Sequence, residues 1–138
     1  MSDELIVRHL DDDRFAIDMR GHTLTVDQPV EAGGTDTAPT PTELFIAGLA
    51  SCVAFYARRY LARHRFSTAG LAVSASYDIG GRPTRVTRIS VYITPPTDLP
   101  PDRRAAFMAV ASHCTVHNTL TAPPQVEIAL TRPPPMTT

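Results

Sequence analysis

A single long helix with a clear starting point constrains the fold of this chain more than any other sequence feature. Thr40, Pro41 and Glu43 fit a capping box, with threonine at the N-cap, proline at the first helical position and glutamate at the third. The sequence ELFIAGLASCVAFYARRYLARHRF then continues without proline from residue 43 to residue 66. Its first half is apolar nearly all round and its C-terminal part is rich in arginine, which predicts a helix buried in the core of a domain.

Segments with strand-like alternation of apolar and polar residues lie on both sides of this helix. The predicted strands are RFAIDMR (14–20), TLTVD (23–27), LAVSASYDI (71–79), RVTRISVYI (85–93) and QVEIALT (125–131). A loop is expected at 29–41, a second helix at 102–114 and a short turn or helix at 115–120. This order predicts an α+β domain in which the helices pack on mostly antiparallel sheet.

The length of 138 residues suits one domain, so we expect a single domain over residues 1–138, with 129–138 partly a frayed tail. A net charge of −1 gives no electrostatic reason to expect nucleic acid as a partner. No apolar run approaches the roughly 20 residues that cross a bilayer, and the acidic start is unlike a secretory signal. We therefore expect a cytoplasmic protein without a membrane partner.

The basic residues restrict the chemistry, because all 13 are arginine. Without lysine the chain can use neither a lysine Schiff base nor a lysine general base, whereas arginine can hold anions. The chain also has two cysteines, Cys52 and Cys114. In the cytoplasm a structural disulfide is disfavoured, which favours two reactive thiols.

The surroundings of the two cysteines differ. Cys52 lies in the apolar half of the long helix, where a thiol can also be a small packing residue, although Gly48 one turn earlier suggests a close approach. Cys114 lies at a break between helical segments, where backbone amides can stabilise a thiolate. A metal site would need Cys114, His117 and two further ligands, so no metal and no cofactor is expected.

Two longer motifs surround these cysteines, GGTDTAPTPTELFIAGLASC (33–52) and ASHCTVHNTL (111–120). Together with the order of elements, they resemble the osmotically inducible protein C and organic hydroperoxide resistance (OsmC/Ohr) family over nearly the whole chain. The resemblance implies one OsmC-like domain with antiparallel sheets packed around a long central helix and a second, shorter helix. It also implies an intertwined homodimer with swapped elements and two active sites at its interface.

The same resemblance implies a thiol-dependent peroxidase that reduces organic hydroperoxides or hydrogen peroxide. Cys52 matches the peroxidatic cysteine and Cys114 the resolving cysteine, and a small dithiol or a protein dithiol would restore the pair. Arg20 matches the arginine that activates the first thiol, with Arg14 as the alternative.

One position departs from the pattern of this family. Thr42 stands where the best-known members have a glutamate that holds the arginine. The neighbouring Glu43 lies on the opposite side of the helix from Cys52, and its capping role already explains it.

Two other functions fit the sequence. The first is a redox-sensing or small-apolar-ligand-binding protein on the same fold, without rapid peroxide turnover. The second is a Cys-His hydrolase in which Cys52 works with His22 or His117, because the sequence does not reveal which imidazole approaches the thiol.

Overall fold

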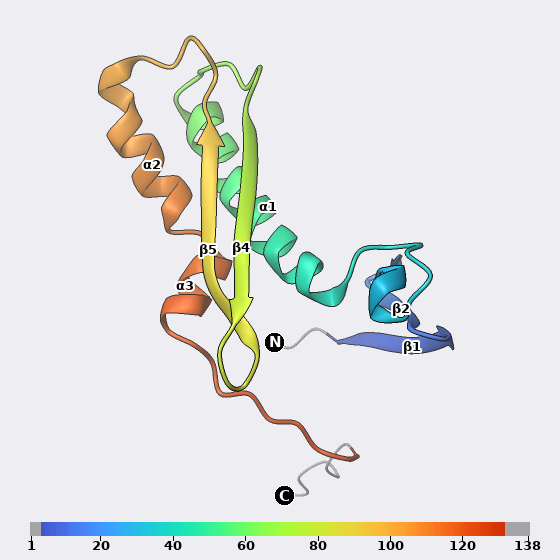
Figure 1. Cartoon of the computed structure of the whole chain (residues 1–138). Coiled ribbons are helices and arrows are strands. Elements are labelled where there is room, and N and C mark those ends of the chain that lie inside the picture. The colour runs from blue at the N-terminus through green and yellow to red at the C-terminus, as the bar shows by residue number, and fades with distance from the viewer. Residues whose placement is uncertain (1–3, 132–138) are drawn as a thin grey trace, which may run out of the picture.

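The computed structural model describes residues 4–131 as two antiparallel sheets and three α-helices (Figure 1). The strands are β1 (Leu5–Asp11), β2 (Arg14–Met19), β3 (His22–Val26), β4 (Ala72–Gly80) and β5 (Arg85–Thr94). The helices are α1 (Pro41–Arg63), α2 (Arg104–Ser112) and α3 (Thr115–Thr121), with short 3-10 turns at Val30–Ala32 and Pro101–Arg103. The predicted α+β class is confirmed. The tail predicted at 129–138 lies outside the described residues from position 132 onward.

The start of α1 has the predicted capping box. The Thr40 hydroxyl accepts the Glu43 backbone N–H at 3.0 Å, and the Glu43 carboxylate accepts the Thr40 N–H at 2.8 Å. The first turn of the helix therefore has partners for two of its otherwise free donors.

One side of α1 forms the centre of the hydrophobic core. A row with a spacing of four residues is buried along it, comprising Leu49, Val53, Ala57 and Leu61. Residues four apart lie above one another on a helix, so this row presents one continuous apolar face. The face packs against β4, β5, α2 and α3, with Phe107 of α2 and Leu99 in the same cluster.

The length and hydropathy of α1 would also allow it to cross a membrane, which the sequence analysis did not expect. Its 23 residues include an 18-residue window with a mean hydropathy of 1.3. Only 33% of that window is buried within the single chain, and Phe45 and Phe55 are among the exposed side chains. The core helix of a domain meets the same criterion, and the packing of α1 against β4, β5, α2 and α3 gives it that role here.

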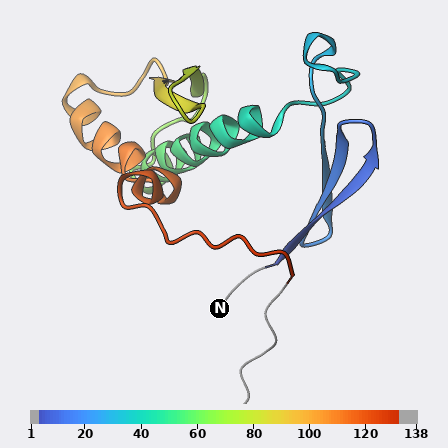
Figure 2. The same cartoon turned by 60° about the horizontal axis from the view of Figure 1, so that its bottom comes forward.

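The N-terminal sheet stands away from the β4–β5 layer and meets the start of α1 (Figure 2). Strands β2 and β3 pair as predicted, and the pair Met19–His22 flanks a two-residue turn. Arg20 and Gly21 in this turn have φ of 47° and 80°, the signature of a type I′ hairpin. Strand β1 was not predicted from the sequence; it pairs with β2 and leaves Leu5, Ile6 and Val7 exposed on this sheet.

The prediction of a strand at 125–131 is wrong for the single chain. No described strand pairs with this segment, and Val126, Ile128 and Leu130 are 74%, 91% and 100% exposed. The alternating pattern is real, but a strand forms only when a neighbouring edge supplies hydrogen-bond partners and an apolar face.

A buried carboxylate organises the loop that joins β3 to α1. Asp27 is 1% exposed, and its oxygens accept hydrogen bonds from the N–H groups of Gln28, Thr35 and Thr37 and from both threonine hydroxyls. A Cβ at Gly34 would clash with the Gln28 carbonyl and approach this carboxylate. The Gly-Thr-Asp-Thr sequence is therefore needed for the shape of the loop.

Burial alone would raise the pKa of Asp27, but the hydrogen bonds from Thr37, Thr35 and Gln28 outweigh it and hold the pKa well below its usual range. A carboxyl whose pKa is lower in the folded chain stabilises the fold above its ordinary pKa of about 3.9. This stabilisation is lost as the pH falls further.

We expect Asp27→Asn to lower the melting temperature by several degrees near neutral pH, because an uncharged amide cannot accept all these hydrogen bonds. The difference from the unmodified protein should shrink as the pH falls below 3.9, about the ordinary value for aspartate. Calorimetry between neutral and acidic pH measures this difference in melting temperature. Asp36→Asn, at an exposed position in the same loop, is the control. A difference independent of pH would contradict the assigned role of the carboxylate.

Candidate functional site

Folding brings the two cysteines together. Cys52 lies in the middle of α1 and Cys114 in the link between α2 and α3, yet the two thiols interact and pack in the same core cluster. Cys52 is half-buried, whereas Cys114 is 0% exposed. A small reagent from solution therefore reaches Cys52 more readily.

Cys114 occupies the N-cap position of α3, and its sulfur accepts the backbone N–H of His117 at 3.4 Å. Burial raises the pKa of Cys114, the N–H groups of His117 and Val116 lower it, and the interaction with Cys52 raises it again. The net direction is upward. Near neutral pH Cys114 is therefore a protonated thiol, poorly suited to attack a reagent first.

A hydrogen bond joins α1 to α3 next to the two cysteines in the sequence. The hydroxyl of Tyr56, one turn after Cys52, lies 2.9 Å from the Thr115 hydroxyl directly after Cys114. Tyr56 shares the helical face of Cys52, so its position was visible in the sequence, but its partner was not. The bond fixes α1 against α3 at the point where the thiols meet.

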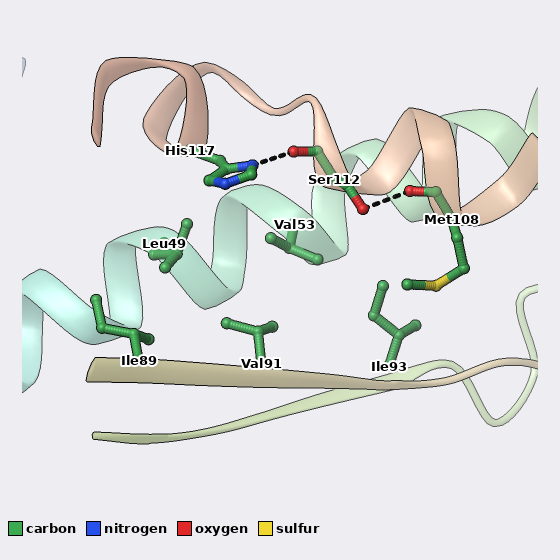
Figure 3. Close-up of a pocket in the computed structure, with 8 residues that line it drawn as sticks. All are labelled: Leu49, Val53, Ile89, Val91, Ile93, Met108, Ser112 and His117. Atoms are coloured by element: carbon green, nitrogen blue, oxygen red, sulfur yellow. Dashed lines mark hydrogen bonds between the residues drawn. The ribbon is translucent and has the colours of Figure 1, made fainter. Parts of the chain in front are cut away.

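An apolar pocket is bounded by α1, β5, α2 and α3 (Figure 3). Its volume is about 210 Å³ and its lining residues are Leu49, Val53, Ile89, Val91, Ile93, Met108, Ser112 and His117. Figure 3 shows the side chains of β5 facing those of α1 across this space. The pocket can accept an alkyl or aryl group, and the sequence analysis had not located it.

The two candidate arginines occupy different settings. Arg14 is engaged, with its guanidinium 2.8 Å from Asp11 and 3.2 Å from the Thr37 hydroxyl. Arg20 lies exposed in the β2–β3 turn, and it has no hydrogen-bond or ion-pair partner within residues 4–131. Over the same residues, no hydrogen bond joins any arginine to Cys52.

His113 and His117, the histidines nearest to Cys114 in the sequence, bind backbone carbonyls. The Nδ1–H of His117 donates to the Ser112 carbonyl, and that of His113 donates to the Ala109 carbonyl at 2.6 Å. Within the described part of the chain, neither His22 nor His117 has a side-chain hydrogen bond to Cys52. Residues 4–131 also contain no cluster of three or more side chains suited to hold a metal ion.

The different environments of the thiols predict different reactivity. Under limiting iodoacetamide near neutral pH, we expect Cys52 to be alkylated at least about tenfold faster than Cys114, which is buried and has a raised pKa. Peptide mass spectrometry over time gives both rates. The difference should vanish in denaturant, and faster modification of Cys114 in the folded protein would contradict this ranking.

Comparison with known proteins identifies the family of the chain. The family model described as OsmC-like protein matches residues 34–129. A search of curated protein sequences found no match.

Solved structures share the fold. A Psychrobacter arcticus protein provisionally assigned to osmotic stress and detoxification is 23% identical with a TM-score of 0.78, covering 86% of this chain and 88% of its own. An OsmC-like protein from Mycoplasma pneumoniae is 16% identical with a TM-score of 0.75, covering 89% of each chain. The organic hydroperoxide resistance protein OsmC of Legionella pneumophila is 19% identical with a TM-score of 0.67, covering 87% and 89%. The chain belongs to the OsmC-like protein family.

Proposed function

We propose that the protein is a thiol-dependent peroxidase that reduces organic hydroperoxides, with Cys52 as the attacking thiol and Cys114 as the resolving thiol. The observation that carries the proposal is the contact between a half-exposed and a fully buried thiol from distant parts of the chain. The similarity to the organic hydroperoxide resistance protein of Legionella pneumophila adds support. The cytoplasm, where thiols are kept reduced, is the proposed location.

The reaction takes two steps. The Cys52 thiolate attacks the outer peroxide oxygen, the O–O bond breaks, and the alkoxide leaves with a proton as alcohol. Cys52 is oxidised to the sulfenic acid and the peroxide is reduced. The Cys114 thiol then attacks the Cys52 sulfur, a disulfide forms and water leaves. A dithiol, as a small molecule or on a protein, exchanges with this disulfide and returns both thiols.

The electrostatics of the pair suit this order. The interaction with Cys52 is one of the causes that raise the pKa of Cys114. When Cys52 becomes a neutral sulfenic acid, its charge no longer opposes ionisation of Cys114. Burial, the largest cause of the raised pKa of Cys114, remains, but the contribution of Cys52 charge is removed after the first step.

The apolar pocket beside the pair supports an organic substrate. His117 belongs both to its lining and to the hydrogen bond on the Cys114 sulfur, so the pocket adjoins the thiols. A hydrocarbon group placed there would leave water, which favours alkyl or aryl hydroperoxides over hydrogen peroxide.

The kinetic test uses purified protein, cumene hydroperoxide and dithiothreitol. We expect Cys52→Ser to reduce peroxide consumption to the uncatalysed background. Cys114→Ser should still react once, leaving a sulfenic acid on Cys52 that dimedone traps and mass spectrometry detects. An unchanged rate of peroxide consumption in Cys52→Ser would contradict the proposal.

Slow turnover would favour the alternative function of redox sensor or apolar-ligand-binding protein. The apolar pocket is the observation in its favour, because a pocket can hold a ligand without reaction. One disulfide formed per chain, without a catalytic cycle across several reductants, would support this function instead of a peroxidase.

We further propose that the working form is a homodimer in which Arg20 of the partner subunit activates Cys52. Three features support it: the open apolar surface of the N-terminal sheet, the exposed segment around Ile128, and the free guanidinium in the β2–β3 turn. Positive φ is uncommon for arginine, and such strain is retained where a side chain has a function. An arginine beside a thiol favours the thiolate. Thr42 stands where the family usually has a glutamate, so Arg20 lacks that acidic partner, and Glu43 is engaged in the helix cap.

Two variants test this arrangement together. Arg20→Asn creates an Asn-Gly turn, the preferred type I′ pair, so the fold should be at least as stable while peroxide reduction falls at least about tenfold. When Arg20→Asn and Cys52→Ser chains are refolded as an equal mixture, statistical pairing should restore about one quarter of the normal sites. No recovery in the mixture, despite dimers by light scattering, would show that Arg20 does not act across the interface.

A further inference from the structure

A second pocket, of basic character, lies between the C-terminal half of α1 and α2. Its volume is about 330 Å³, and its lining residues are Tyr56, Arg59, Tyr60, Arg63, His64, Val110 and His113. None of these residues is needed for the chemistry of the thiols described above. Its combination of arginines, histidines and aromatic rings differs from the lining of the apolar pocket.

The positive charge of this basic pocket is not neutralised by the protein around it. The sequence contains no aspartate or glutamate from residue 44 to residue 77 or from residue 103 to residue 126, which covers all seven lining residues. Within residues 4–131, neither Arg59 nor Arg63 forms an ion pair. A concave surface with uncompensated cations attracts anions.

Aromatic side chains hold part of this charge in place. The Arg59 guanidinium carbon lies 5.7 Å from the centre of the Phe55 ring and 5.9 Å from that of Tyr56, within cation–π range. The His64 ring packs on Tyr60 with centroids 4.4 Å apart. The pocket therefore offers apolar surface next to cations, a combination suited to an organic anion more than to inorganic phosphate.

The basic pocket adjoins the cysteine pair through two of its lining residues. Tyr56 lies one turn beyond Cys52 and its hydroxyl is hydrogen-bonded to Thr115. His113 directly precedes Cys114 and is held by the Ala109 carbonyl. A ligand in this pocket would thus lie beside the wall that encloses the thiols.

We propose that the basic pocket binds the carboxylate of a small organic molecule that takes part in the thiol cycle, with Arg59 and Arg63 holding the anion. This inference rests on the proposed peroxidase function for its role, but the binding itself does not require turnover. Arginine pairs carboxylates through two parallel hydrogen bonds, and the tyrosine rings and Val110 contact the apolar part.

Binding is measured on the full chain carrying Cys52→Ser, with hexanoate as the probe and hexanol and inorganic phosphate as comparisons. In titrations followed by amide NMR, hexanoate should shift signals of residues 56–64 and 109–113. The double variant Arg59→Gln/Arg63→Gln should weaken hexanoate binding at least about tenfold. Arg58→Gln, an exposed arginine on the same helix outside the pocket, removes one charge as a control and should change little.

Three results would overturn the assignment: equal affinity for hexanol, equal affinity for phosphate, or the same loss of binding with Arg58→Gln. Because this experiment uses protein without Cys52, it remains informative even when the peroxidase proposal fails. If the unmodified protein shows no peroxidase turnover while the Cys52→Ser protein binds hexanoate, the proposed function is wrong and the carboxylate site is right.

Two pairs of reactants distinguish whether the peroxide or the dithiol carries the carboxylate. One pair is hydroperoxyhexanoate and cumene hydroperoxide, and the other is dimercaptosuccinate and dithiothreitol. Arg59→Gln/Arg63→Gln should raise KM at least about tenfold for the anionic member of one pair, with kcat and the neutral members unchanged. An unchanged KM for both anionic members would overturn the role in the thiol cycle.

Discussion

The rest of the structure depends on burial of one face of α1. Leu49, Val53, Ala57 and Leu61 follow one another at intervals of four residues, and each contacts the layer formed by β4, β5, α2 and α3. Once this row is buried, the rotation of the helix is fixed. Cys52 must then lie at the edge of the row, half-covered, and it can meet only what the α2–α3 link presents there. The depth of each thiol follows from this packing.

The link between α2 and α3 carries Cys114 and contributes residues to both pockets. His113 directly precedes Cys114 and lines the basic pocket, whereas His117 lies three residues after Cys114 and lines the apolar pocket. A segment of five residues therefore connects both pockets with the buried sulfur. The N–H of His117 on that sulfur and the Tyr56–Thr115 bond hold this link against α1.

Local signals in the sequence predicted α1, its cap and the strand pairs β2–β3 and β4–β5, while the role of the cysteines stays a prediction. These features depend on neighbours along the chain: a threonine three residues from a glutamate, or alternating apolar residues on either side of a turn. The contact between Cys52 and Cys114 joins distant segments, and only the family resemblance, not periodicity, suggested it.

The basic pocket was missed because Arg59, Arg63 and His113 come from two helices whose packing the sequence does not specify. Strand β1 was missed because its run of Leu5, Ile6 and Val7 does not alternate, and the strand at 125–131 requires an edge that the single chain does not provide.

The lack of acidic residues around the basic pocket is one part of an uneven distribution of charge along the whole sequence. Ten of the 14 acidic residues but only three of the 13 arginines fall in residues 1–43, which gives that part −7 and the remainder +6. The net charge of −1 conceals an electric dipole that runs from the N-terminal sheet to the helices. Two such molecules attract when the sheet of one approaches the helices of the other, and they repel when like ends meet. Dissolved salt shortens the range of this preference to about 10 Å at 0.1 M. The orientation of an encounter between two copies is therefore influenced by charge before any apolar surface is in contact.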